Sequence, residues 1–374
     1  MKKRIREFGV QIGSLEPGVR NAITDVPGVT VGHVTLRAGS VQTGVTAIVP
    51  HPGNLFREKV AAAVQVINGF GKTVGTVQIA ELGTLETPIL LTNTLSVGTV
   101  SEALVRYMLE QTPEIGVTTG TVNPVVCECN DGWLNDIRGL HVQAEHVEAA
   151  LKRAGEAVEE GAVGAGTGMT CYGLKGGIGT SSRVVRIGEQ SYTVGVLVLS
   201  NFGRLDDLQV AGQSVGPRIR EQVANATRPE STTTTEQAAP AASTSTNSTD
   251  TCDFPPVPDR DQGSIIIVMA TDLPLSDRQL QRVATRAGVG LVRTGSYIGH
   301  GSGDLVLAFS TATRFPHESP EPILMLPLLH DHFLDPAFRA AAECTEEAIL
   351  NSLVAADPVT GRDGHHCESL RDYL

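Results

Sequence analysis

Hydrophobic and polar positions alternate, or run apolar over short valine-rich spans, in much of the first 200 residues. This pattern predicts β-strands at GVTVGHVTL (28–36), GVTAIVP (44–50), KVAAAVQVI (59–67), SRVVRIG (182–188) and SYTVGVLVLS (191–200). Two longer segments repeat apolar residues at helical spacing. We therefore expect one helix over 97–111, with Val100, Leu104 and Met108 on one face, and a second over 145–161 that ends at Gly161.

The last third of the chain shows the same succession of strand and helix patterns. SIIIVMAT (264–271) and DLVLAFST (304–311) are strongly apolar and predict buried strands. LSDRQLQRVATRAG (275–288) predicts a helix that is capped by Ser276 with Gln279 and ends at Gly288. A last helix is expected from Asp335, with proline next to it. The whole pattern favours a layered α/β protein with helices outside paired sheets.

The region between these two parts, 227–262, has a very different composition. It contains STTTTEQAAPAASTSTNSTD, which has almost no large apolar side chain and cannot offset the entropy lost on ordering. We predict a flexible linker there. Neither flanking part has enough helix to cover its own sheets, so we expect residues 1–374 to form one globular domain.

The net charge of −12 and the pI near 5.3 argue against a nucleic-acid partner, because phosphates require a basic face. No run of 18 apolar residues predicts a membrane span. The basic start, MKKRIREFGVQIG, lacks the apolar core of a signal peptide. These features predict a cytoplasmic protein that binds neither nucleic acid nor membranes.

Cysteines and glycines give no sign of a cofactor. The six cysteines, at 127, 129, 171, 252, 344 and 367, form no C-x-x-C pair, and we predict buried reduced thiols and no metal site. GAGTGMTCYGLKGGIGT (164–180) contains GxGxxG-like spacings, but it follows a predicted helix and leads into a strand. A dinucleotide fingerprint has the reverse order, so tight backbone packing near a site is the better interpretation.

Candidate chemistry begins at Gly263-Ser264, where the linker meets a buried strand. Attack by the Ser264 hydroxyl on the preceding carbonyl, followed by ester hydrolysis, would leave Ser264 as a new amino terminus. An α-amino group has a pKa of roughly 7.7–8.0, so it is able to act as a general base beside its own hydroxyl. An ordinary loop-to-strand junction remains the alternative. No G-x-S-x-G motif is present, and His300 is better interpreted as structural.

Several blocks of the sequence resemble one known family. They include ITDVPGVTVGHVTL, GFGKTVGTVQIAELGTLETPILLTNTLSVG, NDGWLNDIRG, GAGTGMTCYGLKGGIGTSSR, VGVLVLSNFG, QGSIIIVMATDLPL and RTGSYIGHGSGDLVLAFST. In this order they are similar to the DmpA and β-peptidyl aminopeptidase family of self-processing aminopeptidases with an N-terminal serine. The resemblance implies a four-layered α/β/β/α sandwich, like N-terminal nucleophile hydrolases but with different connectivity. It also implies self-association, as a homotetramer of processed heterodimers.

Carried onto this chain, the resemblance implies cleavage between Gly263 and Ser264, giving chains 1–263 and 264–374, with Ser264 as the nucleophile. Ser302 and Asp304 match the supporting serine and acidic residue, although relatives often have glutamate at the second position. If a strand begins early enough, these two side chains project to the same side.

The oxyanion positions follow from the same resemblance. Asn201 matches the asparagine whose amide helps to form the oxyanion hole. Trp133 stands where relatives often have tyrosine, and serves either as an oxyanion donor or as a wall of the pocket. Glu128, close to the NDG segment, is a candidate partner for the free ammonium of a substrate.

We therefore expect an autoprocessed serine aminopeptidase that acts, without a cofactor, on small peptides, amino-acid amides or esters through an acyl-enzyme. One alternative is an acyltransferase with a fold like that of ornithine acetyltransferases, in which threonine is the nucleophile. The other is an uncleaved protein that binds but does not catalyse.

Overall fold

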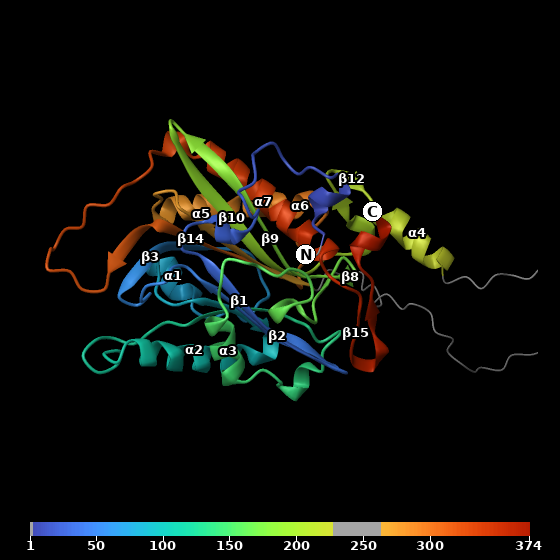
Figure 1. Cartoon of the computed structure of the whole chain (residues 1–374), viewed down its shortest axis with the longest axis horizontal. Helices are drawn as coiled ribbons and strands as arrows, with labels where there is room; N and C mark the ends of the chain where they lie inside the picture. The colour runs from blue at the N-terminus through green and yellow to red at the C-terminus, as the bar shows by residue number, and fades with distance from the viewer. Residues whose placement is uncertain (1–2, 227–262) are drawn as a thin grey trace, which may run out of the picture.

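The computed structural model describes residues 3–226 and 263–374, and two β-sheets form its centre (Figure 1). The smaller sheet is four-stranded, in the order β1 (Thr30–Ala38), β2 (Val41–Val49), β5 (Ile89–Asn93) and β6 (Val125–Cys129). The larger sheet is six-stranded, in the order β4 (Thr84–Leu85), β3 (Glu58–Gly69), β14 (Gly303–Pro316), β13 (Ser264–Thr271), β10 (Gln190–Asn201) and β9 (Gly177–Ile187). The predicted linker at 227–262 lies outside the described residues.

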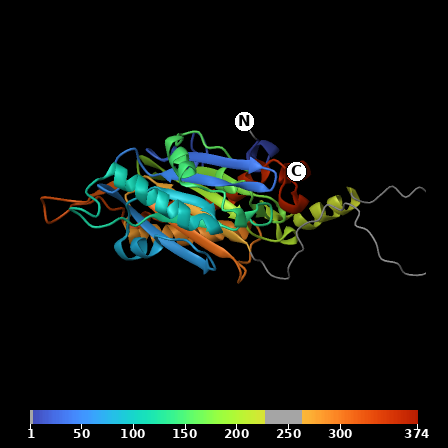
Figure 2. The same ribbon diagram turned by 90° about the horizontal axis from the view of Figure 1, so that it is seen from below.

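Helices cover the outer face of each sheet, so the molecule has four layers (Figures 1 and 2). The smaller sheet carries α2 (Val97–Gln111) and α3 (Ala144–Lys152). The larger sheet carries α5 (Asp277–Thr285), α6 (Ala287–Arg293) and α7 (Asp335–Val354). One hydrophobic core lies between each sheet and its helices. A third core fills the space between the sheets, with Leu91 and Cys127 on one side and Leu199 and Ile266 on the other. The predicted α/β/β/α sandwich is confirmed.

The two parts of the chain interleave within the larger sheet. Strands β13 and β14 come from the last third of the chain and run parallel to each other. They lie between β10 and β3, which come from the first part and pair with them antiparallel. Neither part therefore has a complete larger sheet without the other.

The prediction of a helix over 145–161 is wrong beyond its first turns, because α3 ends at Lys152. The chain then turns to form an antiparallel bridge in which Gly155 and Val31 exchange backbone hydrogen bonds of 2.9 and 3.1 Å. Gly161 caps no helix. It forms a second bridge, with Ile178 at the start of β9. Hydrogen bonds to distant strands outweigh the helical periodicity of this segment.

Gly288 does not end the helix that was predicted over 275–288. The Ser276–Gln279 capping box is present, but α5 ends at Thr285 and Gly288 lies inside the next helix, α6. Helix α6 begins almost at once because it packs on α7. A Cβ atom at Gly290 would lie only 2.4 Å from the carbonyl oxygen of Ala342, so α6 requires glycine at that contact.

The remaining α-helices and strands are short. They are α1 (Thr76–Leu82), α4 (Gly216–Ala226) and three small hairpins, β7–β8 (Thr170–Cys171, Leu174–Lys175), β11–β12 (Gln209–Val210, Gln213–Ser214) and β15–β16 (Val359–Thr360, His366–Cys367). The hairpin β7–β8 lies within the glycine-rich stretch 164–180. Glycine is needed there for close backbone contact, since a Cβ atom at Gly177 would lie 2.2 Å from the carbonyl oxygen of Gly161.

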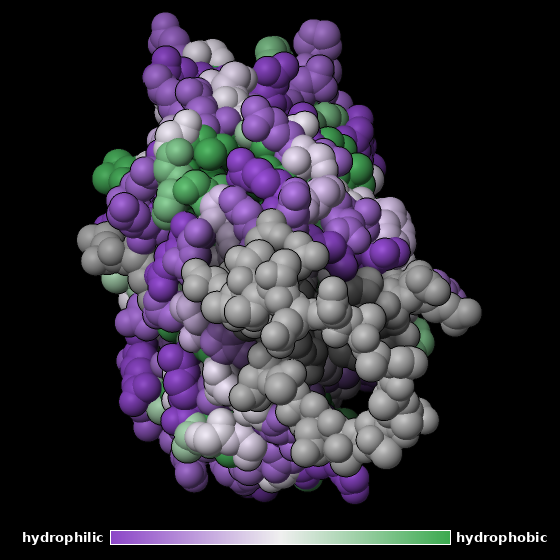
Figure 3. All heavy atoms as spheres, turned by 90° about the vertical axis from the view of Figure 1, so that its right-hand side faces the viewer, coloured by the Kyte–Doolittle hydropathy of each residue, from purple (hydrophilic) through white to green (hydrophobic). Residues whose placement is uncertain are grey.

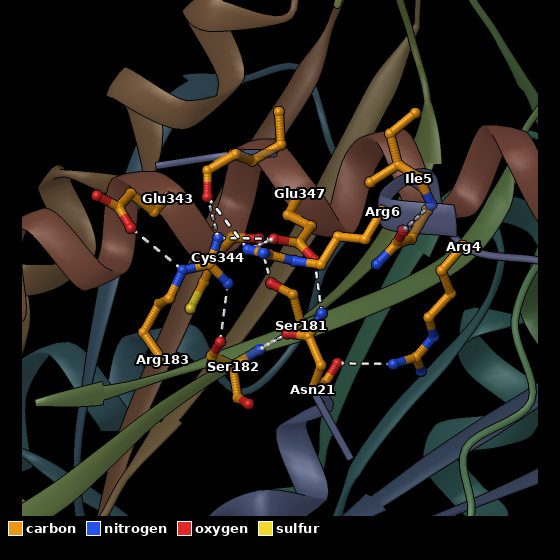
Figure 4. A network of polar contacts seen from close by, with 12 residues as sticks. Arg4, Ile5, Arg6, Asn21, Ser181, Ser182, Arg183, Glu343, Cys344 and Glu347 are labelled. Carbon is orange, nitrogen blue, oxygen red and sulfur yellow. Dashed lines mark hydrogen bonds and ion pairs between the residues drawn. The ribbon is translucent and has the colours of Figure 1, made fainter. Parts of the chain in front are cut away.

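A buried ion network ties the N-terminal segment to α7 and β9 (Figure 4). The Arg183 side chain is fully buried and pairs with Glu343 at 3.1 Å and with Glu347 at 2.6 Å. Glu347 also accepts hydrogen bonds from Arg6 and from Asn21. The four-layer body and the first 25 residues are therefore connected by charge as well as by apolar packing.

Hydrophilic residues predominate on the described part of the face shown in Figure 3. Within residues 3–226 and 263–374, no helix has the length and apolar character needed to cross a membrane.

Candidate active site

Ser264 is the first residue of β13 and lies in the middle of the larger sheet, between β10 and β14. Its register partners are Asn201 and Gly303. The side chain is buried, and the Gly303 N–H donates a 3.3 Å hydrogen bond to the Ser264 Oγ. The rigid central strand fixes this hydroxyl where the sheet ends.

Gly263 is required by close approach of two backbones. A Cβ atom at this position would lie 2.4 Å from the carbonyl oxygen of Asn201 and 2.3 Å from the Cα atom of Phe202. Any side chain would therefore displace the end of β10 from the start of β13. The glycine before Ser264 is a steric requirement of the fold, not only a flexible joint.

Ser302 and Asp304 lie together beside Ser264. Strand β14 begins at Gly303, so the two residues point to the same side, and the Ser302 hydroxyl donates a 2.5 Å hydrogen bond to the Asp304 carboxylate. Both side chains are buried. The Ser302 hydroxyl is thus engaged with Asp304, while the Ser264 Oγ accepts from the Gly303 N–H.

Asn68, which the sequence analysis missed, fixes the turn that carries Ser302. Its side-chain amide donates to the carbonyl oxygens of Gly299 and His300, at 3.0 and 3.1 Å, and also to that of Ser302. His300 is exposed and contacts Asn68 through its backbone carbonyl oxygen. Asn68 stands near the end of β3 with no motif around it, so only the strand pairing reveals its partners.

Asn201 ends β10 directly across from Ser264. Its Oδ1 accepts a 2.9 Å hydrogen bond from the backbone N–H of Thr170, and its Nδ2 donates one of 3.0 Å to the carbonyl oxygen of Asn130. A carboxamide has two N–H donors, so these contacts fix its orientation and still leave one hydrogen for another acceptor. Thr170 and Asn130 were missed because they act through the backbone, where residue type carries little signal.

Lys175 is fully buried and organises the loop that holds Asn201. Its ammonium donates to the carbonyl oxygens of Gly166, Met169 and Gly176, at 3.1, 2.6 and 2.8 Å. Met169 is followed by Thr170, whose N–H contacts Asn201. A buried ammonium requires partners of this kind. A lysine within a glycine-rich segment was the available signal for this role.

Glu128 lies at the same end of the sheets as Ser264. Its neighbours Cys127 and Cys129 face the core between the sheets, so Glu128 points to the opposite side of β6. Its carboxylate accepts a 2.9 Å hydrogen bond from the backbone N–H of Lys72 and another from the Thr94 hydroxyl. The loop before Lys72 touches the site, because a Cβ atom at Gly303 would lie 3.1 Å from Gly71.

Trp133 lies in the turn after β6, against the C-terminal segment. Its indole stacks on the His365 ring, with centroids 3.7 Å apart and planes 3° from parallel, and its carbonyl oxygen is 2.8 Å from His365 Nδ1. Leu134 and Cys367 belong to the same small cluster. These contacts fix the orientation of the indole ring.

Burial changes the acidity of several groups around this end of the sheets. It raises the pKa of Asp131 to about 7, and hydrogen bonds such as the 3.0 Å bond from Asn135 oppose the rise. It also raises the pKa of the Cys127 and Cys367 thiols to about 12. The thiols are therefore inert at neutral pH. The described residues contain no cluster of His, Cys, Asp and Glu suited to a metal ion.

A serine at the head of a central strand, directly across from an anchored asparagine, is suited to a hydrolase that uses an N-terminal nucleophile. Residues 21–367 match peptidase family S58. The chain belongs to this family and is an aminopeptidase of the N-terminal nucleophile type. This membership favours the hydrolase over the acyltransferase and the non-catalytic binding protein.

Individual relatives agree with the family. The chain is 42% identical to the beta-peptidyl aminopeptidase BapA of Sphingosinicella microcystinivorans, over 98% of this chain and 89% of the relative. A crystal structure of a protein from Pyrococcus horikoshii OT3 is 50% identical, with a TM-score of 0.87 over 99% of this chain and 97% of that one.

A second solved structure connects the fold to a described enzyme class. The l-aminopeptidase d-ala-esterase/amidase of Ochrobactrum anthropi is 36% identical, with a TM-score of 0.83 over 100% of this chain and 99% of that one. It is described as a prototype for the serine aminopeptidases and as a new variant among the Ntn hydrolase fold.

Proposed function

We propose that this aminopeptidase processes itself between Gly263 and Ser264, and that Ser264 is then its nucleophile. The observation that carries the proposal is the position of Ser264. It is a buried hydroxyl at the head of the central strand, directly across from Asn201 and beside Ser302 and Asp304. Gly263 leaves no bulk next to the bond that is to be cut.

Processing requires no reagent other than water. The Ser264 Oγ attacks the carbonyl carbon of Gly263, the C–N bond breaks, and the proton of the hydroxyl is transferred to the departing nitrogen. The resulting ester between Gly263 and the Ser264 Oγ is then hydrolysed. The products are a carboxylate on Gly263 and a free α-amino group on Ser264, which titrates near neutral pH.

Peptide cleavage uses the same hydroxyl. The neutral α-amino group takes the proton of the Ser264 Oγ as it attacks the substrate carbonyl, and returns a proton to the leaving amine. The remaining N–H of Asn201 stabilises the oxyanion. Water then releases the acyl group from the Ser264 Oγ. Asp304, oriented by Ser302, favours the charged form of the amine during the transfer.

Glu128 is the proposed partner for the ammonium of the substrate, and Trp133 forms part of the wall of the site. The Glu128 carboxylate is buried and held by Lys72 and Thr94, so its position is defined before a substrate arrives. The substrates are small peptides, amino-acid amides and esters with a free amino terminus. The relatives include a beta-peptidyl aminopeptidase and an l-aminopeptidase d-ala-esterase/amidase, which supports this range.

Self-association, as a homotetramer of processed heterodimers, is part of the proposal. The segment between β14 and α7 projects from the body of the molecule (Figures 1 and 2). It presents apolar side chains to solvent, with Ile323 75% and Met325 91% exposed. Contiguous exposed apolar residues of this kind favour contact with another copy of the chain. A cytoplasmic location stays a prediction.

Intact-mass measurement of the purified protein tests the processing. We expect two chains, and N-terminal sequencing of the smaller one is expected to begin at Ser264. A single full-length chain in a preparation that hydrolyses amino-acid amides would contradict the proposal. A panel of small aminoacyl amides and esters then identifies the preferred amino-terminal residue.

A further inference from the structure

Lys72 lies on a loop that contacts both the candidate ammonium site and the strand next to Ser264. Its backbone N–H donates to the Glu128 carboxylate at 2.9 Å. The residues just before it abut β14, because a Cβ atom at Gly303 would lie 3.1 Å from the carbonyl oxygen of Phe70 and from the Gly71 nitrogen. Gly303 itself donates to the Ser264 Oγ. The Lys72 backbone is therefore fixed relative to both Glu128 and the nucleophile.

The Lys72 side chain has only neutral partners. Its ammonium donates a 3.3 Å hydrogen bond to the Phe70 carbonyl oxygen and lies 4.5 Å from the centroid of the Phe70 ring. Lys72 is exposed, and the Phe70 side chain is 58% exposed. Among residues 3–226 and 263–374, no carboxylate forms an ion pair with this ammonium, whereas Lys59 and Lys152 pair with Glu86 and Glu148. Contact with an exposed ring is weak and easily exchanged.

The charges around the nucleophile are therefore complementary to those of a short free peptide. Glu128 provides a carboxylate for an amino terminus, and Lys72 provides an ammonium for a carboxyl terminus. The termini of an extended dipeptide are about 7 Å apart, a separation that a flexible lysine side chain is able to match from a backbone attached to Glu128. A lysine bound to a carboxylate gains a charge-assisted hydrogen bond that the Phe70 carbonyl oxygen cannot offer.

We infer that Lys72 binds the free C-terminal carboxylate of the substrate and so makes the enzyme selective for dipeptides and other very short peptides over their C-terminal amides. The inference rests on the proposed function, since it assumes that Ser264 is the nucleophile and that Glu128 binds the amino terminus of the substrate. The Phe70 ring, released when Lys72 turns to the substrate, is then available to an apolar side chain on the leaving residue.

The test compares one dipeptide with its own C-terminal amide, using the amino-terminal residue that the amide panel selects. We expect Lys72→Met to raise the KM for the free dipeptide by roughly 3- to 10-fold and to leave the KM for the amide unchanged. The variant keeps an unbranched side chain, one atom shorter than that of lysine, and the backbone N–H that holds Glu128, so the ammonium end of the site stays intact. Lys72→Arg is expected to retain the preference, because guanidinium also binds carboxylate.

Lys152→Met is the matched control, because this exposed lysine lies on α3, in the outer helix layer of the smaller sheet. It is expected to leave both KM values unchanged. If Lys72→Met changes the KM for the dipeptide and for the amide equally, or changes neither, the inference is wrong. The proposed function still stands in that case, provided that the wild type hydrolyses the amide. If the wild type does not hydrolyse the amide, the proposed function itself is contradicted.

Discussion

Two buried polar clusters of this protein differ in how completely their members are paired. The Arg183 cluster joins β9, α7 and the N-terminal segment, and each nitrogen of the Arg183 guanidinium donates to an oxygen of Glu343, Glu347, Ser182 or Ile12. The Asn201 amide at the end of β10 has two anchoring contacts and one N–H left over.

The pKa of a buried carboxyl group shifts in one direction in the Arg183 cluster and in the other direction next to the site. Burial alone would raise the pKa of Glu347, but hydrogen bonds from Arg6 and the charge of Arg183 outweigh it and lower the pKa. Next to the site, burial prevails at Asp131 and raises its pKa to about 7. A saturated cluster stabilises the fold and has nothing to offer a ligand. A cluster that keeps an unused N–H donor, next to a carboxyl group whose pKa is near neutral, is suited to a reaction.

Ser264→Ala gives the largest expected effect. Turnover should fall on the order of 10⁶-fold, the loss typical of removing a nucleophilic serine, and the chain should remain in one piece because the same hydroxyl cuts it. Hydrolysis of an amino-acid amide and intact mass are the measurements. Ser319→Ala, at an exposed loop, is the control and should be processed and active. A cleaved Ser264→Ala protein would assign the self-cleavage to another residue.

Arg183→Met should affect stability and not chemistry. It leaves Glu343 and Glu347 buried without their central partner, which typically costs about 3–5 kcal/mol of unfolding free energy. Urea denaturation measures the loss, and turnover of the folded enzyme should stay close to that of the wild type. Arg186→Met is the matched control on the same strand, because its pair with Glu16 is exposed and contributes little. Equal stability of the two variants would show that the Arg183 network does not stabilise the fold.

Asn201→Ala should lower turnover by roughly 10²–10³, the usual loss for one oxyanion donor, with little change in melting temperature. The reason is that its remaining N–H serves the transition state more than the ground state. Trp133→Phe provides the comparison, since it keeps an apolar wall but deletes the indole N–H. We expect Trp133→Phe to change the Michaelis constant at most. A loss of turnover as large as that of Asn201→Ala would make Trp133 a second donor.

Deletion of residues 232–248 should have the smallest effect. Shortening a long connection changes loop-closure entropy only slightly, and the Ser-, Thr- and Ala-rich composition of this segment predicts no catalytic chemistry. Melting temperature, processing and turnover should all resemble those of the full chain. Abolished activity in a variant that keeps its melting temperature would mean that the segment contributes to the site.

Residues identified by position within a motif were predictable, and residues defined by a distant backbone partner were not. The alternation of Ser302 and Asp304 indicated that they share a side, and the structure brings them together. Asn68 lies in no motif. Thr170 and Asn130 lie in two of the matching blocks, but they contact Asn201 through their backbone, where residue type carries little signal. Glu343 and Glu347 are four residues apart on α7, but only the fold shows that Arg183 lies between them.

The sequence by itself determined the family, the identity of most strands and the helix over 97–111, because local periodicity and motif order carry that information. It also indicated Ser264, through the junction of a polar segment with a buried strand. Only the tertiary structure decided where the helices at 145–161 and 275–288 end, why Gly263 has no room for a side chain, and which donor of Asn201 stays available. These properties depend on contacts between strands far apart in the chain, and such contacts leave no periodic trace in the sequence.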